Sequence, residues 1–196
     1  MRSFKTDKRK SKIISVVTAR QQSLHLVLEN IHDPHNVSAI FRTCDAAGIP
    51  KVSLIYNIES FPKIGKKSSA SAFKWVEKTK YTDVKSCYDN LRRQGFKIYA
   101  SAITDDSKNF YDLDFTQKIA IVLGNEHRGV SEEAAALADG KFLIPMLGMV
   151  QSLNVSVAAA IVLYEAVRQR IEKDMYSKSE LNDEQLEEKI NEWCRK

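Results

Sequence analysis

Short hydrophobic runs alternate with amphipathic segments along this chain, and the pattern predicts strands and helices in turn. Leu24, Leu26 and Leu28 form an alternating run that predicts the first strand. Further apolar runs predict strands over residues 51–56, 73–77, 96–103, 118–123 and 141–145. Because strands and helices follow one another, we expect an α/β fold with a mainly parallel sheet.

Polar capping residues mark where the intervening helices begin. Asn36 is predicted to cap a helix over residues 37–47, which Gly48 ends because glycine readily adopts a positive φ. Further helices are predicted over residues 83–94, capped by Asp83, over 132–138, capped by Ser131, from near Asn154, and over 183–193. Polar loops leave strand ends at residues 33–36, 124–129 and 145–154, and a ligand site is expected where they meet.

Composition and charge narrow the class of protein. The chain has 196 residues, of which 43% are hydrophobic and 28% charged, as is usual for one globular domain. Its net charge is +5, and residues 1–20 hold seven Lys and Arg against Asp7 alone, which indicates an anionic partner or simply a solvated arm. The three separated cysteines, Cys44, Cys87 and Cys194, predict a reduced, cytoplasmic protein. No signal peptide, membrane span or metal-ligand spacing is expected.

Three contiguous segments carry the candidate chemistry, and each also has a purely structural explanation. In the first, HNVSAIFRTCDAAG at residues 35–48, Asn36 is explained as a helix cap and Arg42 by pairing with Asp45. In the second, LGNEHRGVS at 123–131, two glycines let the backbone approach a ligand closely, and the structural explanation is that they only form a sharp turn. The third, IPMLGMVQSLNVSVAAAI at 144–161, combines an apolar wall with backbone amides that suit a flat heteroaromatic ring.

Taken together, these segments resemble the three signature motifs of the SpoU/TrmH family of SPOUT RNA 2′-O-methyltransferases. The resemblance covers roughly residues 24–168 and implies a SPOUT-like α/β fold with a C-terminal trefoil knot over about 121–168. It implies a methyltransferase domain over residues 23–170, a basic N-terminal extension over 1–22 and a C-terminal helical extension over 171–196. The short helical extensions at both ends are similar to those of the tRNA-modifying members.

The resemblance also implies a cofactor, partners and site residues. The cofactor is S-adenosyl-L-methionine (SAM), no metal is needed, and each active site forms across a homodimer. The residues expected to bind SAM are Ser101, Leu123, Gly124, Ile144, Met146 and Leu153. The residues expected in catalysis are Arg42, Asn36, Glu126, Ser152 and Asn154. The residues expected to contact RNA are Lys8, Arg9, Arg20, His35, Arg168 and Arg170.

Arg42 matches the arginine assigned the catalytic role in this family. It acts either as a base assisted by an RNA phosphate or by stabilising the alkoxide that develops on a ribose 2′-hydroxyl. The second role is at least as plausible chemically, because a guanidinium holds its proton tightly. The expected reaction is 2′-O-methylation of tRNA, with the D-loop guanosine at position 18 as target. Ribosomal RNA, another tRNA position, or an inactive RNA-binding module are the alternatives.

Overall fold

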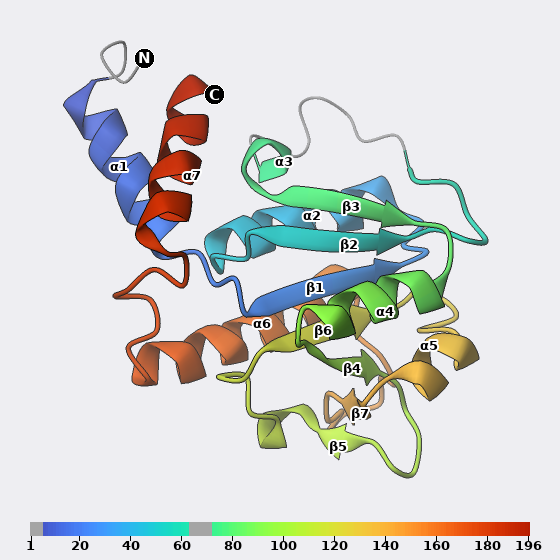
Figure 1. Cartoon of the computed structure of the whole chain (residues 1–196). Coiled ribbons are helices and arrows are strands. Elements are labelled where there is room, and N and C mark those ends of the chain that lie inside the picture. The colour runs from blue at the N-terminus through green and yellow to red at the C-terminus, as the bar shows by residue number, and fades with distance from the viewer. Residues whose placement is uncertain (1–5, 63–71) are drawn as a thin grey trace.

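The computed structural model describes residues 6–62 and 72–196, and its centre is a parallel sheet of seven strands (Figure 1). The strand order is β3-β2-β1-β6-β4-β7-β5, and every described pairing between neighbouring strands is parallel. The strands are β1 (Leu24–Glu29), β2 (Lys51–Ile55), β3 (Glu77–Tyr81), β4 (Lys97–Ser101), β5 (Lys108–Asn109), β6 (Ile119–Leu123) and β7 (Gly140–Leu143). The expected α/β class with a mainly parallel sheet is confirmed.

Helices cover both faces of this sheet. One face packs against α2 (Pro34–Ala46), the short α3 (Ala72–Trp75) and α6 (Val155–Glu172). The other packs against α4 (Val84–Arg93) and α5 (Glu132–Leu137). Every residue of β1 and β6 is buried, as expected of central strands that helices cover on both faces. A 3-10 turn, Phe110–Asp112, follows β5.

The two ends of the chain form a pair of helices beside the sheet. Helix α1 (Asp7–Thr18) lies against α7 (Asp183–Arg195), at the end of the molecule where β1 begins (Figure 1). Ile13 and Val17 of α1 pack with Ile190 and Trp193 of α7 in a small core of their own. The helical extensions expected at both ends are therefore present.

Two local predictions are wrong. The helix after β1 begins at Pro34, and its N-cap is Asp33, whose side chain accepts a hydrogen bond from the His35 amide at 2.7 Å. Asn36 is thus free for other contacts. The strand expected over residues 73–77 is instead α3 followed by β3, because the Phe73 ring stacks on Phe41 of α2, with centroids 4.2 Å apart. Gly48 has the predicted positive φ, +77°.

Arg170 ties the helical ends to the sheet domain. Its side chain is fully buried, and its guanidinium donates to the carbonyls of Phe115 at 2.9 Å, Gln117 at 3.0 Å and Ser23 at 3.2 Å. It also donates to the side chain of Gln21 at 3.0 Å. The structure contradicts the expected RNA contact of Arg170, because its donors are used inside the protein.

We expect Arg170→Met to lower the free energy of unfolding by about 3 kcal/mol, since several buried acceptors lose their donor. The matched control is Arg168→Met, two residues earlier on α6. Arg168 is half exposed and, among the described residues, pairs with Glu165 and Glu172 on the same helix, so its replacement should cost less than about 1 kcal/mol. Urea unfolding of both variants measures the difference, and equal destabilisation would contradict a structural role specific to Arg170.

Candidate active site

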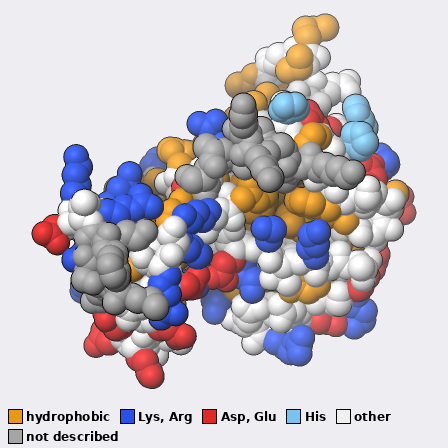
Figure 2. Space-filling model, turned by 90° about the horizontal axis from the view of Figure 1, so that it is seen from above, with side chains coloured by type: hydrophobic (Ala, Val, Ile, Leu, Met, Phe, Trp, Pro, Cys, Tyr) orange, Lys and Arg blue, Asp and Glu red, His pale blue; other side chains and the backbone are white. Residues whose placement is uncertain are grey.

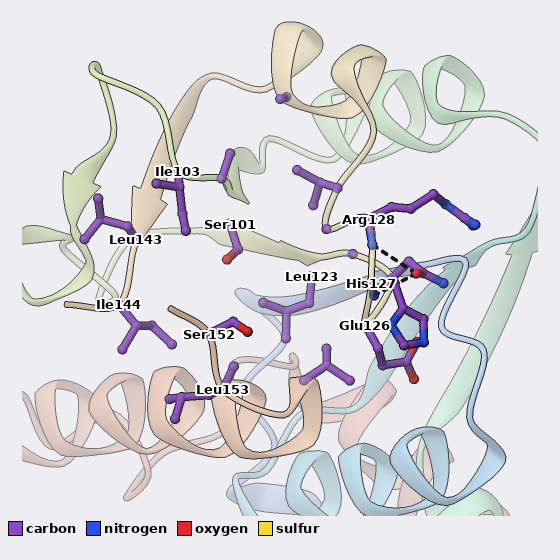
Figure 3. Close-up of a pocket in the computed structure, with 18 of the residues that line it drawn as sticks. Ser101, Ile103, Leu123, Glu126, His127, Arg128, Leu143, Ile144, Ser152 and Leu153 are labelled. Atoms are coloured by element: carbon purple, nitrogen blue, oxygen red, sulfur yellow. Dashed lines mark hydrogen bonds between the residues drawn. The ribbon is translucent and has the colours of Figure 1, made fainter. Parts of the chain in front are cut away.

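A pocket of about 510 Å³ lies where β4, β6 and β7 end (Figure 3). Leu123 ends β6, Ile144 follows β7, and Leu153 precedes α6; their apolar side chains converge on the pocket from three segments (Figure 3). All six residues expected to bind the cofactor line it: Ser101, Leu123, Gly124, Ile144, Met146 and Leu153. The lining combines these apolar side chains with polar and charged ones, including Glu126 and Arg128, and this mixture suits a small organic cofactor that has an apolar ring and charged groups.

Gly124 permits a close approach of the backbone at the pocket wall. A Cβ at this position would lie 2.1 Å from the carbonyl carbon of Gly129 and 2.1 Å from the amide nitrogen of Val130. The chain returns here because the Asn125 side chain accepts hydrogen bonds from the amides of His127 at 2.9 Å and Arg128 at 3.2 Å. Any side chain at Gly124 would therefore displace the loop over residues 124–130.

A chain of hydrogen bonds joins the three motif segments beside the pocket. The Glu126 carboxylate accepts from the Asn36 amide group at 2.9 Å and from the backbone amides of His32 at 3.0 Å and Asp33 at 3.1 Å. Asn36 in turn accepts from the Asn154 side chain at 3.0 Å. The structure thus brings together three of the five residues expected in catalysis.

The hydrogen bonds of Glu126 also set its charge. Partial burial disfavours the carboxylate, but the donors from Asn36, His32 and Asp33 outweigh burial and hold the pKa of Glu126 below its usual value. Glu126 is therefore a fixed anion near neutral pH. An anion held in this way orders loops and orients amide groups; it is a poor proton acceptor for catalysis.

Asn154 links this network to α6. It caps the helix as predicted, because its side-chain oxygen accepts from the Ser156 amide at 2.8 Å and from the Ser156 hydroxyl at 2.6 Å. Ser152, two residues earlier, is exposed and lines the pocket together with Glu126. The starts of α2 and α6 and the loop after β6 are thus held together at one corner of the pocket.

Arg42 lies on the exposed face of α2 and does not line the pocket of its own chain. It lies six residues beyond Asn36, or about 9 Å along the helix axis. The pairing with Asp45 that would explain it structurally is absent, because Asp45 pairs with the guanidinium of Arg20. Within the described ranges, Arg42 makes no hydrogen bond or ion pair.

The other residues expected to contact RNA divide into buried and exposed ones. Arg20 is only 2% exposed and donates to the Ile49 carbonyl at 2.9 Å besides pairing with Asp45, so the structure contradicts its expected RNA contact. Lys8 and His35 are exposed, and Arg9 lies over the Trp75 ring, 5.4 Å from its centroid. The charge of Arg168 is offset by Glu165 and Glu172.

Sequence reasoning missed a carboxylate that contacts two of the residues lining the pocket, Asn125 and Arg128. Glu59, in the loop after β2, accepts from Arg128 at 2.7 Å, from His32 at 2.8 Å and from Asn125 at 3.3 Å. The Arg128 and His32 hydrogen bonds hold the pKa of Glu59 below its usual value. No motif marks Glu59, because its partners are up to 69 residues away and it lies in a loop. It fastens the loop after β2 to the loop after β6.

Two classes of site do not occur in the described part of the chain. Residues 6–62 and 72–196 contain no group of three or more His, Cys, Asp or Glu side chains placed to hold a metal ion. Within the same residues, no helix has both the length and the hydrophobicity needed to cross a membrane.

Comparisons with known proteins agree with this geometry. The model of the SpoU rRNA Methylase family matches residues 23–164. The tRNA (guanosine(18)-2′-O)-methyltransferase of Thermus thermophilus is 43% identical, over 98% of each chain. A solved structure described as the A. aeolicus TrmH/SpoU tRNA modifying enzyme superposes with a TM-score of 0.89, at 39% identity and 96% coverage of both chains. The SpoU methyltransferase AviRb from Streptomyces viridochromogenes, in complex with the cofactor AdoMet, gives a TM-score of 0.67 at 27% identity, covering 79% of this chain and 62% of that one.

The hydrogen bonds of Glu126 predict a pH-dependent contribution to stability. Folding lowers the pKa of the Glu126 carboxyl, so the ionised carboxylate contributes its full stabilisation above the pKa that this group has in the unfolded chain. That stabilisation is lost as the pH falls through the pKa of the folded protein. We expect Glu126→Gln to destabilise the protein at pH 7, because its amide group cannot accept from all three donors. The difference from wild type should shrink below about pH 4.5.

Urea unfolding of wild type and Glu126→Gln between pH 3 and pH 7 measures this contribution. Glu133→Gln is the matched control, since Glu133 is exposed on α5. A difference between wild type and Glu126→Gln that stays constant with pH would show that the carboxylate charge is not what the network requires.

Proposed function

We propose that this chain, which belongs to the SpoU rRNA methylase family, is a SAM-dependent tRNA ribose 2′-O-methyltransferase that modifies guanosine 18 of the D-loop. The observation that carries the proposal is the hydrogen-bonded chain from Glu126 through Asn36 to Asn154, which assembles all three motifs beside one pocket. The likeness to the Thermus thermophilus enzyme extends over both terminal helices and supports tRNA as substrate. A tRNA substrate also places the enzyme in the cytoplasm.

The pocket fits SAM. Leu123, Ile144 and Leu153 supply apolar walls for an adenine ring, and the bare backbone at Gly124 leaves room that a side chain would fill. Ser101 and Ser152 add hydroxyl groups at the margins. When bound, SAM supplies a methyl group on a sulfonium, which is open to in-line attack by a ribose 2′-oxygen.

Arg42 is proposed to act on the ribose. The 2′-oxygen gains negative charge as its proton leaves, and a guanidinium within hydrogen-bond distance stabilises that charge. Since Arg42 lies outside the pocket of its own chain, we propose that it serves the pocket of a second copy in a homodimer. Val157, Tyr164 and Ile171 are exposed at intervals of seven residues on α6 and offer an apolar stripe for that copy. The trefoil knot over about residues 121–168 is part of the same proposal.

Replacing Gly124 should impair cofactor binding. We expect Gly124→Ala to raise the SAM dissociation constant at least about tenfold, because the loop over residues 124–130 must move away from the pocket. Gly148→Ala is the control: its Cβ would meet nothing within 4 Å, so affinity should be unchanged. Isothermal titration of both variants decides, and tight SAM binding by Gly124→Ala would contradict the assigned pocket.

Mapping ribose methylation in tRNA transcripts incubated with labelled SAM tests the reaction itself. We expect label at guanosine 18, and methylation of ribosomal RNA or of another tRNA position would overturn the assigned target. Arg42→Ala and Arg42→Lys should both lose methyl transfer while keeping SAM affinity within a few-fold, because a point charge cannot reproduce the forked guanidinium. Loss of SAM binding would make Arg42 structural.

Mixing Arg42→Ala with Gly124→Ala tests the shared site. At a SAM concentration too low to load Gly124→Ala, a heterodimer still combines the intact pocket of one subunit with the intact Arg42 of the other, so a fully exchanged mixture should regain about one quarter of wild-type activity. If each chain held a complete site, the mixture would stay inactive.

A further inference from the structure

We infer that the outer edge of the sheet is an RNA-binding surface, on which Lys78 and Lys80 of β3 hold the phosphate backbone of the substrate. The inference rests on the proposed function and extends it, because neither lysine belongs to the three motifs. It is based on the positions of the Lys78 and Lys80 ammonium groups. Both are exposed, lie over aromatic rings, and are located between the terminal helices and the loops that surround the pocket.

Lys78 and Lys80 lie on the same face of the edge strand. They pair in register with Val52 and Leu54 of β2, whose side chains are buried on the face covered by α2. Alternate residues of a strand are about 7 Å apart, so the two side chains stand next to each other. Both lysines are exposed. The basic side chains are thus on the same side of the sheet as Arg42.

Aromatic rings seat both ammonium groups. The Lys80 nitrogen lies 4.6 Å from the centroid of the Phe61 ring, and the Lys78 nitrogen lies 5.5 Å from that of Phe73. Phe73 is itself stacked on buried Phe41 of α2, so the position of the Phe73 ring is held by the core. A ring attracts the cation without neutralising it and leaves the ammonium donors free for an anion.

Two acidic side chains beside this edge, Glu77 and Glu192, are already paired. Glu77, which precedes Lys78, accepts from Lys189 of α7 at 2.5 Å, and Glu192 accepts from Lys189 and Lys196, each at 2.8 Å. Among the described residues, no carboxylate lies within ion-pair distance of Lys78 or Lys80. The charges of Lys78 and Lys80 are therefore available to an external anion.

The basic surface continues from β3 to the terminal helices. Arg9 of α1, Lys74 of α3 and Lys196 of α7 all lie over the Trp75 ring, between 5.1 and 5.9 Å from its centroid. Figure 2 looks down on this edge: Lys and Arg side chains, with Asp and Glu among them, lie over the terminal helices on the left, other Lys and Arg side chains stand beside hydrophobic side chains in the middle, and histidines lie beyond. Basic and aromatic side chains interleaved along one surface are typical of RNA backbone contacts.

A lysine-rich edge strand also has a bland explanation, since lysines prevent two sheet edges from pairing. Two features favour RNA over that explanation. The strand continues a basic surface that starts on a different element, and it leads in the direction of the loops at the carboxyl ends of the strands, where the pocket lies. Preventing two sheet edges from pairing requires neither a continuous basic surface nor a surface that leads toward the pocket.

The test compares binding of an unmodified tRNA transcript to full-length wild type and Lys78→Ala/Lys80→Ala over a series of salt concentrations. Removing one lysine from a phosphate should reduce the slope of log affinity against log salt by about one, so we expect a fall of about two. Lys97→Ala/Lys108→Ala is the matched control, with two exposed lysines taken from β4 and the opposite edge strand β5. It should keep the wild-type slope.

Further measurements separate the explanations. Lys78→Arg/Lys80→Arg should keep the wild-type slope of log affinity against log salt. Lys78→Ala/Lys80→Ala should raise the KM for tRNA while its SAM dissociation constant stays the same. An unchanged slope with larger particles in sedimentation would overturn the inference in favour of edge protection. If wild type methylates tRNA and the alanine pair binds it equally well at every salt concentration, only this inference fails. If wild type neither binds nor methylates tRNA, the proposed function fails with it.

Discussion

The carboxylate of Glu126 accepts three hydrogen bonds, from the backbone amides of His32 and Asp33 and from the side chain of Asn36, and the arrangement of the site depends on them. Because the acceptor is charged, each bond is stronger than one between neutral groups. Asn36 passes the connection to Asn154, so the starts of α2 and α6 are fixed relative to the loop after β6. That loop forms the wall of the pocket. One partly buried anion thus aligns three segments that are far apart in the sequence.

Cationic side chains fall into two groups that do different work. Arg20 and Arg170 are buried, and both donate hydrogen bonds to carbonyl oxygens of the protein. They join the terminal helices to the sheet. Arg42, Lys78 and Lys80 are exposed and have no carboxylate partner among the described residues. A polyanionic substrate is the partner that this second group suits, because its phosphates can replace the missing carboxylates.

The terminal helices contact a buried arginine, Arg20, and carry exposed basic residues of their own. Packing of α1 on α7 through Ile13, Val17, Ile190 and Trp193 brings the basic N-terminal segment next to the C-terminus. Trp75 of α3 contacts Trp193, with ring centroids 4.6 Å apart, so this helical pair also rests on the β3 edge. Arg9 and Lys196 of these helices thus meet Lys74, just before the edge strand, at the Trp75 ring.

Strands β1, β2, β4, β6 and β7, the caps at Asp83 and Ser131, and six of the residues that line the pocket can be predicted from the sequence. These depend on local hydrophobic runs, local turns and contiguous motifs, which a sequence displays directly. Other features emerge only in the fold: Asp33 caps α2, and Asn36 bonds to residues 90 and 118 positions away. In the same way, Phe73 belongs to a helix, and Arg20 and Arg170 are buried while Arg42 is exposed. The physical reason is the same in each case: a side chain's partner, and with it its burial and charge state, comes from a distant segment that only folding brings within reach.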